Sequence, residues 1–339
     1  MAFDFPASPT VGQQFTPAGG PVYIWNGYAW AVQSVAISAG GPPQGRLTLQ
    51  SNTPVMTTTQ AAKTAIFYTP YVGNQIPLYN GTSMVMTTFA ELTVATTDTT
   101  KNPAAIGASK VNDWFIWNDS GTIRLGHGVD WASDTTRGAP AALTMINGIL
   151  LNGFTITNGP AAQRGTYVGT TRSNASSQLD WIIGGTGAGG VAAFFGVWNC
   201  YNRVDVSAQI IDNTASWSYT SLTFRQKNAS PGNQVSFVAG LNEDAVQVIA
   251  SQCVQADGTG VTGIIGISID STTTTYGSAQ EGTAFTNGIS GVVCVFSGTL
   301  FGFHFFAPIE RITGAGTATF YGSGRFSLNQ NSFAFQLRM

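Results

Sequence analysis

The chain has 339 residues, of which 43% are hydrophobic and only 9% are charged, and its formal net charge is −2 at pH 7. This length accommodates two domains of ordinary size and a small further unit. Soluble domains usually carry about 25% charged residues. In this chain, hydroxyl, amide and backbone groups must therefore form much of the polar surface that is exposed to solvent. The few, scattered basic residues argue against a nucleic-acid partner, since phosphate binding requires clustered Lys and Arg.

The residue types predict turn-rich β-structure. The chain has 41 Gly and two threonine runs, at 57–59 and 272–275; threonine suits a pleated surface and glycine suits its turns. The cysteines, Cys200, Cys253 and Cys294, lie far apart, so their spacing indicates neither a zinc site nor a disulfide framework. We therefore expect an all-β protein that holds no metal and no cofactor.

The N-terminal segment predicts a small hairpin. Residues 22–25 lead through Asn26-Gly27 into residues 28–30, and Asn-Gly between aromatic strands is a strong hairpin signal. A hairpin of this size is marginal alone, so we expect its aromatic side chains to anchor the protein to a partner; they are Tyr23, Trp25, Tyr28 and Trp30.

Gly- and Pro-rich residues 39–45 have the composition of a linker. This places a first unit, the docking hairpin and its linker, at residues 1–40. The first residues show no secretory pattern, which predicts synthesis in the cytoplasm.

Residues 41–204 are expected to form a β-rich middle domain. Strand-like runs at 65–68, 75–79 and 114–117 alternate with turn clusters such as Asn80-Gly81 and residues 118–121. Helical periodicity is absent, apart from a single turn expected at 139–143.

Residues 205–339 continue this spacing, with runs at 245–251, 264–269 and 318–321. Short strands at near-regular intervals predict a C-terminal β-sandwich, jelly-roll-like in its arrangement. We expect this domain to be the one that oligomerises.

Residues 291–309 carry no formal charge and approach the length of a membrane span. Ser297-Gly298-Thr299 interrupts the run, so two adjacent buried strands are expected instead of a span. Both faces of these strands are apolar, which predicts that one face packs against another subunit. The interface positions expected are Val293, Val295, Phe301, Phe303 and Phe305.

Candidate catalytic groups are few. His127, Asp130 and Asp134 lie close in sequence with Arg137 nearby, but no activated nucleophile accompanies them, and a hydrogen-bonded turn is the simpler interpretation.

Two carboxylate pairs have the chemistry for glycan cleavage: Asp205 with Asp212, and Glu243 with Asp244. Neither spacing implies a cleft. We expect no catalytic residue and no enzymatic activity.

The glycine motif at 185–190 satisfies the dinucleotide pattern, as does the motif at 258–263. Because the flanking βαβ units are missing, both predict loops. Three aromatic residues, Trp217, Tyr219 and Tyr276, are candidates for stacking on a sugar.

Motifs at residues 66–81, 117–121, 197–204 and 240–246 resemble, in the same order, those of bacteriophage tail and minor structural proteins. Residues 5–12 are similar to a small module of phage structural proteins. The resemblance implies a virion protein assembled in the host bacterial cytoplasm, namely a fibre or spike that is commonly a homotrimer. Its expected partners are other virion proteins and a host surface glycan. A capsid or collar cement protein and a glycan depolymerase remain as alternatives.

Overall fold

The computed structural model describes residues 4–17, 20–32, 41–257, 260–276, 280–282, 289–324 and 332–339. Within them every regular element is a strand, apart from two 3₁₀ turns, η1 (Ala139–Ala141) and η2 (Lys227–Ala229). This confirms the predicted all-β class. No helix in the described part of the chain is long and apolar enough to cross a membrane. The chain divides into two compact units, Met1–Gly40 and Gly41–Met339.

The N-terminal unit is a three-stranded antiparallel sheet of β1 (Gln14–Phe15), β2 (Tyr23–Trp25) and β3 (Trp30–Val32). The side chain of Asn26 closes the turn after β2, because its Oδ1 accepts hydrogen bonds from the backbone N–H groups of Tyr28 and Ala29. The predicted hairpin is therefore present and has one further strand.

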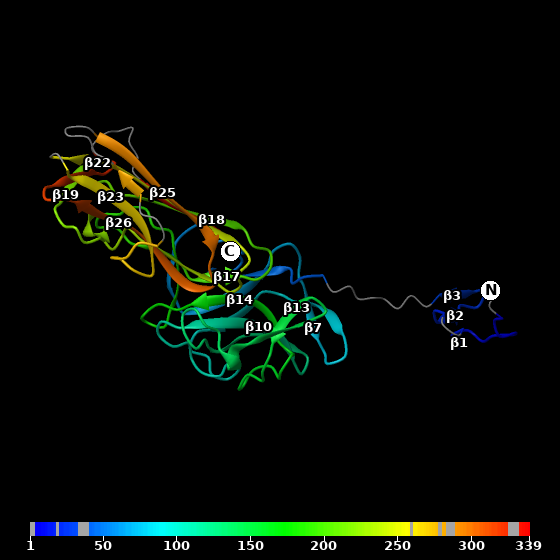
Figure 1. Ribbon diagram of the computed structural model, residues 1–339. Coiled ribbons are helices and arrows are strands. Elements are labelled where there is room, and N and C mark those ends of the chain that lie inside the picture. The colour runs from blue at the N-terminus through cyan, green and yellow to red at the C-terminus, as the bar shows by residue number, and fades with distance from the viewer. Residues whose placement is uncertain are drawn as a thin grey trace. The chain divides into compact units, whose positions relative to one another are not determined.

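The second unit begins with three groups of strands. A three-stranded sheet has the order β4-β6-β9, a separate hairpin pairs β7 with β8, and the β10 sheet has the order β11-β10-β14-β13-β12 with β17 also pairing with β14 (Figure 1). The strands are β4 (Gly45–Thr48), β6 (Ala65–Pro70), β7 (Gln75–Tyr79), β8 (Met84–Thr88), β9 (Leu92–Ala95), β10 (Val111–Asp119), β11 (Thr122–Asp130), β12 (Leu143–Ile146), β13 (Ile149–Asn152), β14 (Thr166–Arg172) and β17 (Val197–Asn199).

An eight-stranded sheet, the β26 sheet, crosses the expected boundary between residues 204 and 205. Its order is β24-β23-β26-β21-β16-β15-β5, with β20 also pairing with β26. Its strands are β5 (Gln60–Lys63), β15 (Leu179–Ile182), β16 (Ala193–Phe195), β20 (Arg225–Gln226), β21 (Val235–Ala239), β23 (Thr262–Ile269), β24 (Gln280–Gly282) and β26 (Gly302–Thr313). The pairing of β16 with β21 is parallel. Backbone hydrogen bonds thus join the expected middle and C-terminal domains into one unit, so that boundary was wrong.

The β22 sheet completes the fold, with the order β18-β28-β22-β27-β19 and with β25 also pairing with β22. Its strands are β18 (Asp205–Ile211), β19 (Ser216–Tyr219), β22 (Ala245–Ala256), β25 (Ile289–Thr299), β27 (Ala318–Tyr321) and β28 (Ser332–Arg338). It packs on the β26 sheet through aromatic rings: Phe335 lies 5.6 Å from Phe195 and 5.4 Å from Phe237. The predicted C-terminal sandwich is therefore present, but its second sheet also contains strands from before residue 204.

Residues 291–309 form strands, as expected, but these strands are not adjacent in one sheet. β25 continues through Ser297-Gly298-Thr299, and β26 begins at Gly302. β25 pairs with β22, whereas β26 pairs with β20, β21 and β23. Leu300 and Phe301 therefore carry the chain from one sheet of the sandwich to the other.

Candidate functional site

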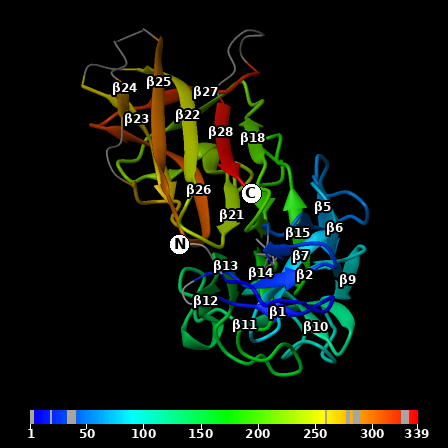
Figure 2. The ribbon, with the colours of Figure 1, turned by 90° about the vertical axis from the view of Figure 1, so that its right-hand side faces the viewer.

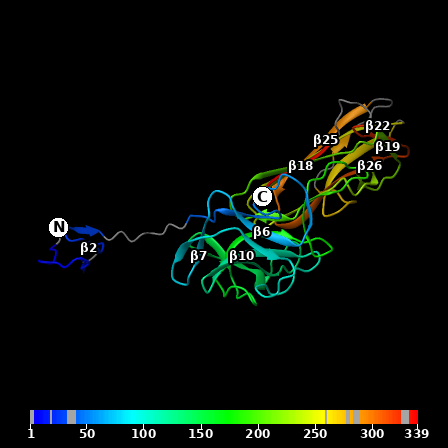
Figure 3. The ribbon, with the colours of Figure 1, turned by 180° about the vertical axis from the view of Figure 1, so that it is seen from behind.

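A groove of ≈ 590 Å³ lies between the β7–β8 hairpin, the β10–β11 turn and the loop at 159–164. Figures 1 and 3 both show β7 beside β10. The residues that line the groove are Leu78, Tyr79, Asn80, Val85, Thr87, Trp117, Asn118, Asp119, Ser120, Gly121, Gly159, Pro160, Ala161 and Arg164. Aromatic, amide, hydroxyl and charged groups thus meet in one hollow that opens to solvent.

Two asparagine-initiated turns hold the rim of this groove. In the β7–β8 turn, Asn80 Oδ1 accepts the backbone N–H groups of Thr82 and Ser83, both at 2.9 Å. In the β10–β11 turn, Asn118 Oδ1 accepts the N–H of Gly121 at 2.6 Å. Asparagine favours such turns because its side chain replaces a backbone acceptor. Both turns are fixed locally by their sequence.

Arg164 lies against the first of these turns. Its guanidinium is 5.4 Å from the centre of the Tyr79 ring, and a Cβ on Gly81 would meet the guanidinium nitrogens at 2.3–2.4 Å. Gly81 also has φ +105°, a conformation that residues with a side chain rarely adopt. The positive φ therefore favours glycine at position 81, and the missing side chain leaves room for the guanidinium of Arg164.

Asp119 is the one carboxylate that lines the groove. Its Oδ2 lies 2.7 Å from Lys101 Nζ and 3.6 Å from Arg124 Nε. The hydrogen bond from Lys101 is the main cause that lowers the pKa of Asp119, so this carboxylate is ionised at neutral pH. Cleavage of a glycosidic bond by the usual mechanism uses two carboxyl groups, and one lines this groove.

The sequence contained a signal for this groove. The turn clusters Asn80-Gly81 and 118–121 each follow an aromatic residue, Tyr79 and Trp117. Sequence reasoning identified the turns but missed the site, because only the fold brings them together with the loop at 159–164.

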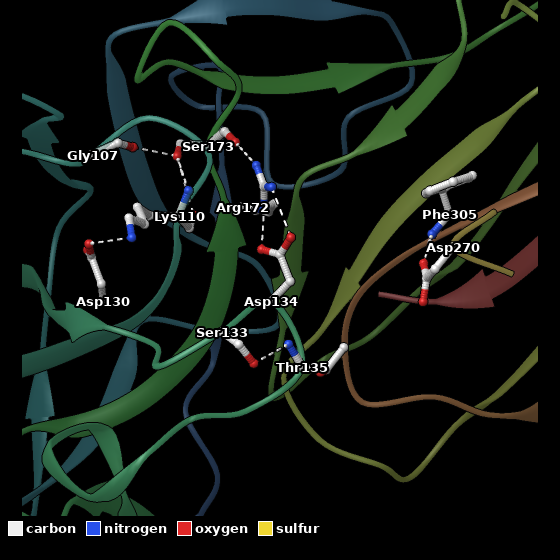
Figure 4. Close-up of polar contacts among 10 residues, drawn as sticks. All are labelled: Gly107, Lys110, Asp130, Ser133, Asp134, Thr135, Arg172, Ser173, Asp270 and Phe305. Carbon is white, nitrogen blue, oxygen red and sulfur yellow. Dashed lines mark hydrogen bonds and ion pairs between the residues drawn. The ribbon is translucent and has the colours of Figure 1, made fainter. Parts of the chain in front are cut away.

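The residues around His127 do not form a catalytic cluster. His127 is buried, and its Nδ1 lies 2.7 Å from the carbonyl oxygen of Gly128. Asp130 pairs with Lys110 at 3.9 Å, and Asp134 pairs with Arg172 at 2.9 Å, as Figure 4 shows. These groups therefore have separate structural partners, and no three potential metal ligands gather among the described residues.

Arg137 belongs to a buried joint between the β10 sheet and β26. Its Nε donates to Asp113 Oδ2 at 2.6 Å, and its Nη2 donates to the carbonyl oxygen of Gly240 at 2.8 Å. The guanidinium also lies 4.5 Å from the ring of Trp131 and 5.3 Å from that of Phe301. Burial is the largest influence on Asp113 and raises its pKa, while the charge of Arg137 acts in the opposite direction.

The loop after β11 completes this joint. The carbonyl oxygen of Asp134 accepts the N–H of Phe303 at 2.8 Å, and Arg172 lies 4.3 Å from the Phe303 ring. A Cβ on Gly302, which has φ +99°, would come within 2.4 Å of that same carbonyl oxygen. The start of β26 is thus held by both arginines and by close backbone contact.

The proposed carboxylate pairs have other partners. Asp205 lies 3.7 Å from Arg338, and Asp212 accepts hydrogen bonds from Asn228 and Asn233. Glu243 and Asp244 both contact Arg203, at 2.8 and 2.7 Å. These carboxylates stabilise local structure and do not line the groove.

The glycine motif at 185–190 forms a tight loop. Backbone hydrogen bonds join Gly187 N to Ile211 O and Ile211 N to Gly185 O, and a Cβ on Gly187 would clash with Asn233. No helix follows the motif, as expected for a loop. The second motif lies partly outside the described residues, because Gly258 and Thr259 are not described.

The expected sugar-stacking aromatics are not brought into the groove. The Nε1 of Trp217 donates to Glu310 at 2.9 Å, and its ring stacks on Phe320. Tyr219 lies 3.9 Å from the guanidinium of Arg225. Tyr276 is exposed and its ring contacts Phe296.

The N-terminal aromatics largely cover one another. Phe5 stacks on Trp30 at 5.4 Å and contacts Tyr23 at 5.0 Å, while Trp25 lies 5.8 Å from Trp30. Tyr28, in contrast, is 92% exposed. Our premise that all four aromatics need an external partner was therefore wrong, because Phe5 and the third strand supply internal contacts.

The five expected interface residues lie on two different surfaces. Val293 and Val295 point outward from the β22 sheet and are 53% and 66% exposed. Phe301 stacks on Trp131 at 4.9 Å, and Phe303 lies 5.7 Å from Phe194. Phe305, half-buried on β26, donates its N–H to Asp270 Oδ1 (Figure 4). One continuous patch of these five residues does not exist, because β25 and β26 belong to opposite sheets.

The outer face of the β22 sheet is almost free of charge. Figure 2 shows β25, β22, β28 and β18 side by side. Apart from Asp205 and Arg338 at one end, their outward positions carry only uncharged side chains, and Gln209, Ala334, Ile249 and Val295 form one row across the four strands. The sequence predicted the exposed valines but not this four-stranded surface.

The sequence matches no protein-family model and no curated protein. Solved structures resemble the chain weakly. Dimeric latent PorU from Porphyromonas gingivalis has 10% identity over 69% of this chain and 20% of its own, with a TM-score of 0.26. A tryptic core variant of Cry1Da from Bacillus thuringiensis has 8% identity over 82% of this chain and 50% of its own, with a TM-score of 0.17. Infectious bursal disease virus, Gt strain, has 11% identity over 89% of this chain and 80% of its own, with a TM-score of 0.19.

The chain spans a fifth of the length of the first of these structures and half of the second. At such TM-scores none of the three carries an argument about function.

Proposed function

We propose that this chain is a structural protein of a bacteriophage particle, a fibre or spike appendage that binds a host surface glycan through the groove beside β7 and β10. The groove carries the binding part of the proposal. Sugars present C–H faces that pack on aromatic rings and hydroxyls that pair with amides and carboxylates, and Tyr79, Asn80, Asn118 and Asp119 offer these groups together. The resemblance of the sequence motifs supports the place in a virion.

Tyr79→Ala is expected to weaken glycan binding about tenfold, because it removes the half-buried ring at the groove wall, and an aromatic contact is worth about 0.5–1.5 kcal/mol beyond its area. The measurement is binding of full-length protein to a panel of bacterial capsular and lipopolysaccharide glycans, with an assay for new reducing ends. Tyr71→Ala, in an exposed tyrosine outside the groove, is the matched control.

Binding without new reducing ends supports an adhesive protein. Release of reducing ends would instead favour the depolymerase. If no glycan binds, the cement or collar alternative is favoured, and gold-labelled antibody on intact particles would locate the protein.

The N-terminal unit is the proposed attachment to the particle. It is a separate compact unit, and Tyr28 gives it an exposed aromatic side chain. This role needs only Tyr28 and the outer surface of the small sheet, since the other rings pack on one another.

Self-association is proposed at the outer face of the β22 sheet, and the resemblance implies three copies. β22 and β25 pair over eleven positions, and four strands lie side by side. At about 3.4 Å per residue and 4.8 Å per strand, eleven positions on β22 and β25 and seven on β18 and β28 give a face of roughly 600 Å². A stable interface needs about 800 Å² from each partner, so the face supplies most of the area that another copy requires.

Val293→Lys combined with Val295→Lys is expected to raise the dissociation constant of the oligomer roughly 100-fold, because opposed unpaired charges cost several kcal/mol. Native mass spectrometry of the full chain at micromolar concentration measures it. Val72→Lys changes a similarly exposed valine outside this face and should leave the oligomer intact. A wild-type chain that is a soluble monomer would refute self-association.

A further inference from the structure

Arg164 differs from the other arginines that the structure describes. Each of the others donates a hydrogen bond to a carboxylate or a backbone carbonyl oxygen, or forms an ion pair with a carboxylate. The guanidinium of Arg164 has no such acceptor within the described residues, and its Nη1 is buried without a hydrogen-bond partner. Leaving a charged donor unsatisfied is costly. Nη1 itself is covered by the chain, so an acceptor from outside the chain can pair with the guanidinium only at its other nitrogen atoms.

The position of Arg164 lets an acceptor in the groove reach the guanidinium. The side chain lines the groove on the side of the β7–β8 turn, where the guanidinium lies against Gly81 and the Tyr79 ring. A planar guanidinium matches the two oxygens of a carboxylate.

The local charge also favours an anion. Asp119 is the only acidic residue among those that line the groove, and two cations, Lys101 and Arg124, lie next to it. Lys101 and Arg124 thus pair with this carboxylate, and Arg164 adds a third cation at the groove, although the whole chain has a net charge of −2. An acidic ligand meets little repulsion here.

We infer that the groove binds an acidic saccharide, with the sugar carboxylate at Arg164, the sugar ring against Tyr79, and hydroxyls at Asn80 and Asn118. This inference rests on the proposed glycan-binding function and specifies its ligand class. Neutral glycans would leave the guanidinium unsatisfied, so they should bind more weakly than acidic ones.

The test uses full-length protein and a panel of oligogalacturonate, oligoglucuronate and sialyllactose, each before and after chemical reduction of its carboxylates to alcohols. Isothermal titration calorimetry is expected to show that reduction weakens binding about 10- to 100-fold, the usual range for loss of a hydrogen bond to a charged group. Arg164→Gln should weaken binding of the acidic form by a similar factor and should leave the reduced form unchanged. Arg338→Gln, which makes the same charge change at an exposed site on β28, should change neither.

Equal binding of the acidic and reduced forms, with Arg164→Gln without effect, would overturn the acidic ligand and leave glycan binding intact. Failure of every saccharide, in both forms, to bind the wild-type protein would count against the proposed function itself. A circular dichroism spectrum and an unfolding midpoint unchanged from wild type verify that Arg164→Gln still folds.

Discussion

Asp113→Asn is expected to destabilise the unit formed by residues 41–339 by about 3–5 kcal/mol, because it leaves Arg137 buried and charged without its counter-ion. Asp113 is 1% exposed and lies 2.6 Å from Arg137 Nε. Thr170 donates a further hydrogen bond to the same carboxylate at 2.7 Å. The change in the free energy of unfolding is measured by guanidinium chloride denaturation of full-length protein.

Two further variants make this test specific to the buried pair. Arg124→Met breaks an exposed pair with Asp119 and should cost at most about 1 kcal/mol. The double variant Asp113→Asn with Arg137→Met should cost less than the sum of the two single changes, because it removes both charges together. A loss below about 1 kcal/mol for Asp113→Asn would show that the joint does not hold the two sheets together.

Lys227→Met is expected to stabilise the protein by roughly 3 kcal/mol at pH 7, and the gain should disappear as the pH rises. Lys227 is 4% exposed, and burial lowers its pKa to about 8 from 10.5. One pKa unit corresponds to about 1.4 kcal/mol. The nearby Asp212, Glu310 and Cys253 each raise the pKa but do not offset burial.

The direction of the pH dependence follows from proton binding. Between about pH 8 and 10.5 the unfolded chain keeps the Lys227 proton while the folded chain has lost it, so the stability of the wild type rises with pH in this window. Below pH 8 both states are protonated, and the folded state carries the full cost of a buried ammonium group. The difference in unfolding free energy between wild type and Lys227→Met should therefore narrow from pH 7.5 to 9.5.

Comparing the two proteins at each pH cancels the contributions of other titrating groups. A constant difference for Lys227→Met over this pH range would mean that the buried ammonium group is solvated in the folded protein.

Local sequence determined the strands and turns of this protein. The run at 75–79 is β7 and the run at 318–321 is β27, as predicted, and the single helical turn expected at 139–143 is the 3₁₀ turn Ala139–Ala141. Alternation of side chains and the turn preferences of Asn and Gly act between residues a few positions apart. These signals can therefore be recognised from the sequence alone.

Only the tertiary structure decided which strands share a sheet. Residues 291–309 showed two apolar strands, but not that β25 and β26 would lie in opposite sheets of the sandwich. A period of two separates the faces of a strand and says nothing about what covers each face. For this reason the sequence alone could not show that Val293 is exposed whereas Phe303 packs against other side chains.

The candidate groove depended on the tertiary structure in the same way. Tyr79, Trp117 and Arg164 are far apart in the chain and meet because β7, β10 and the loop at 159–164 are neighbours in the fold. The missing acceptor of Arg164 is likewise a property of three-dimensional surroundings, since 16 Asp and Glu residues were available in the sequence. Composition thus determined an all-β chain with little charge, whereas long-range strand pairing decided where its few charges act.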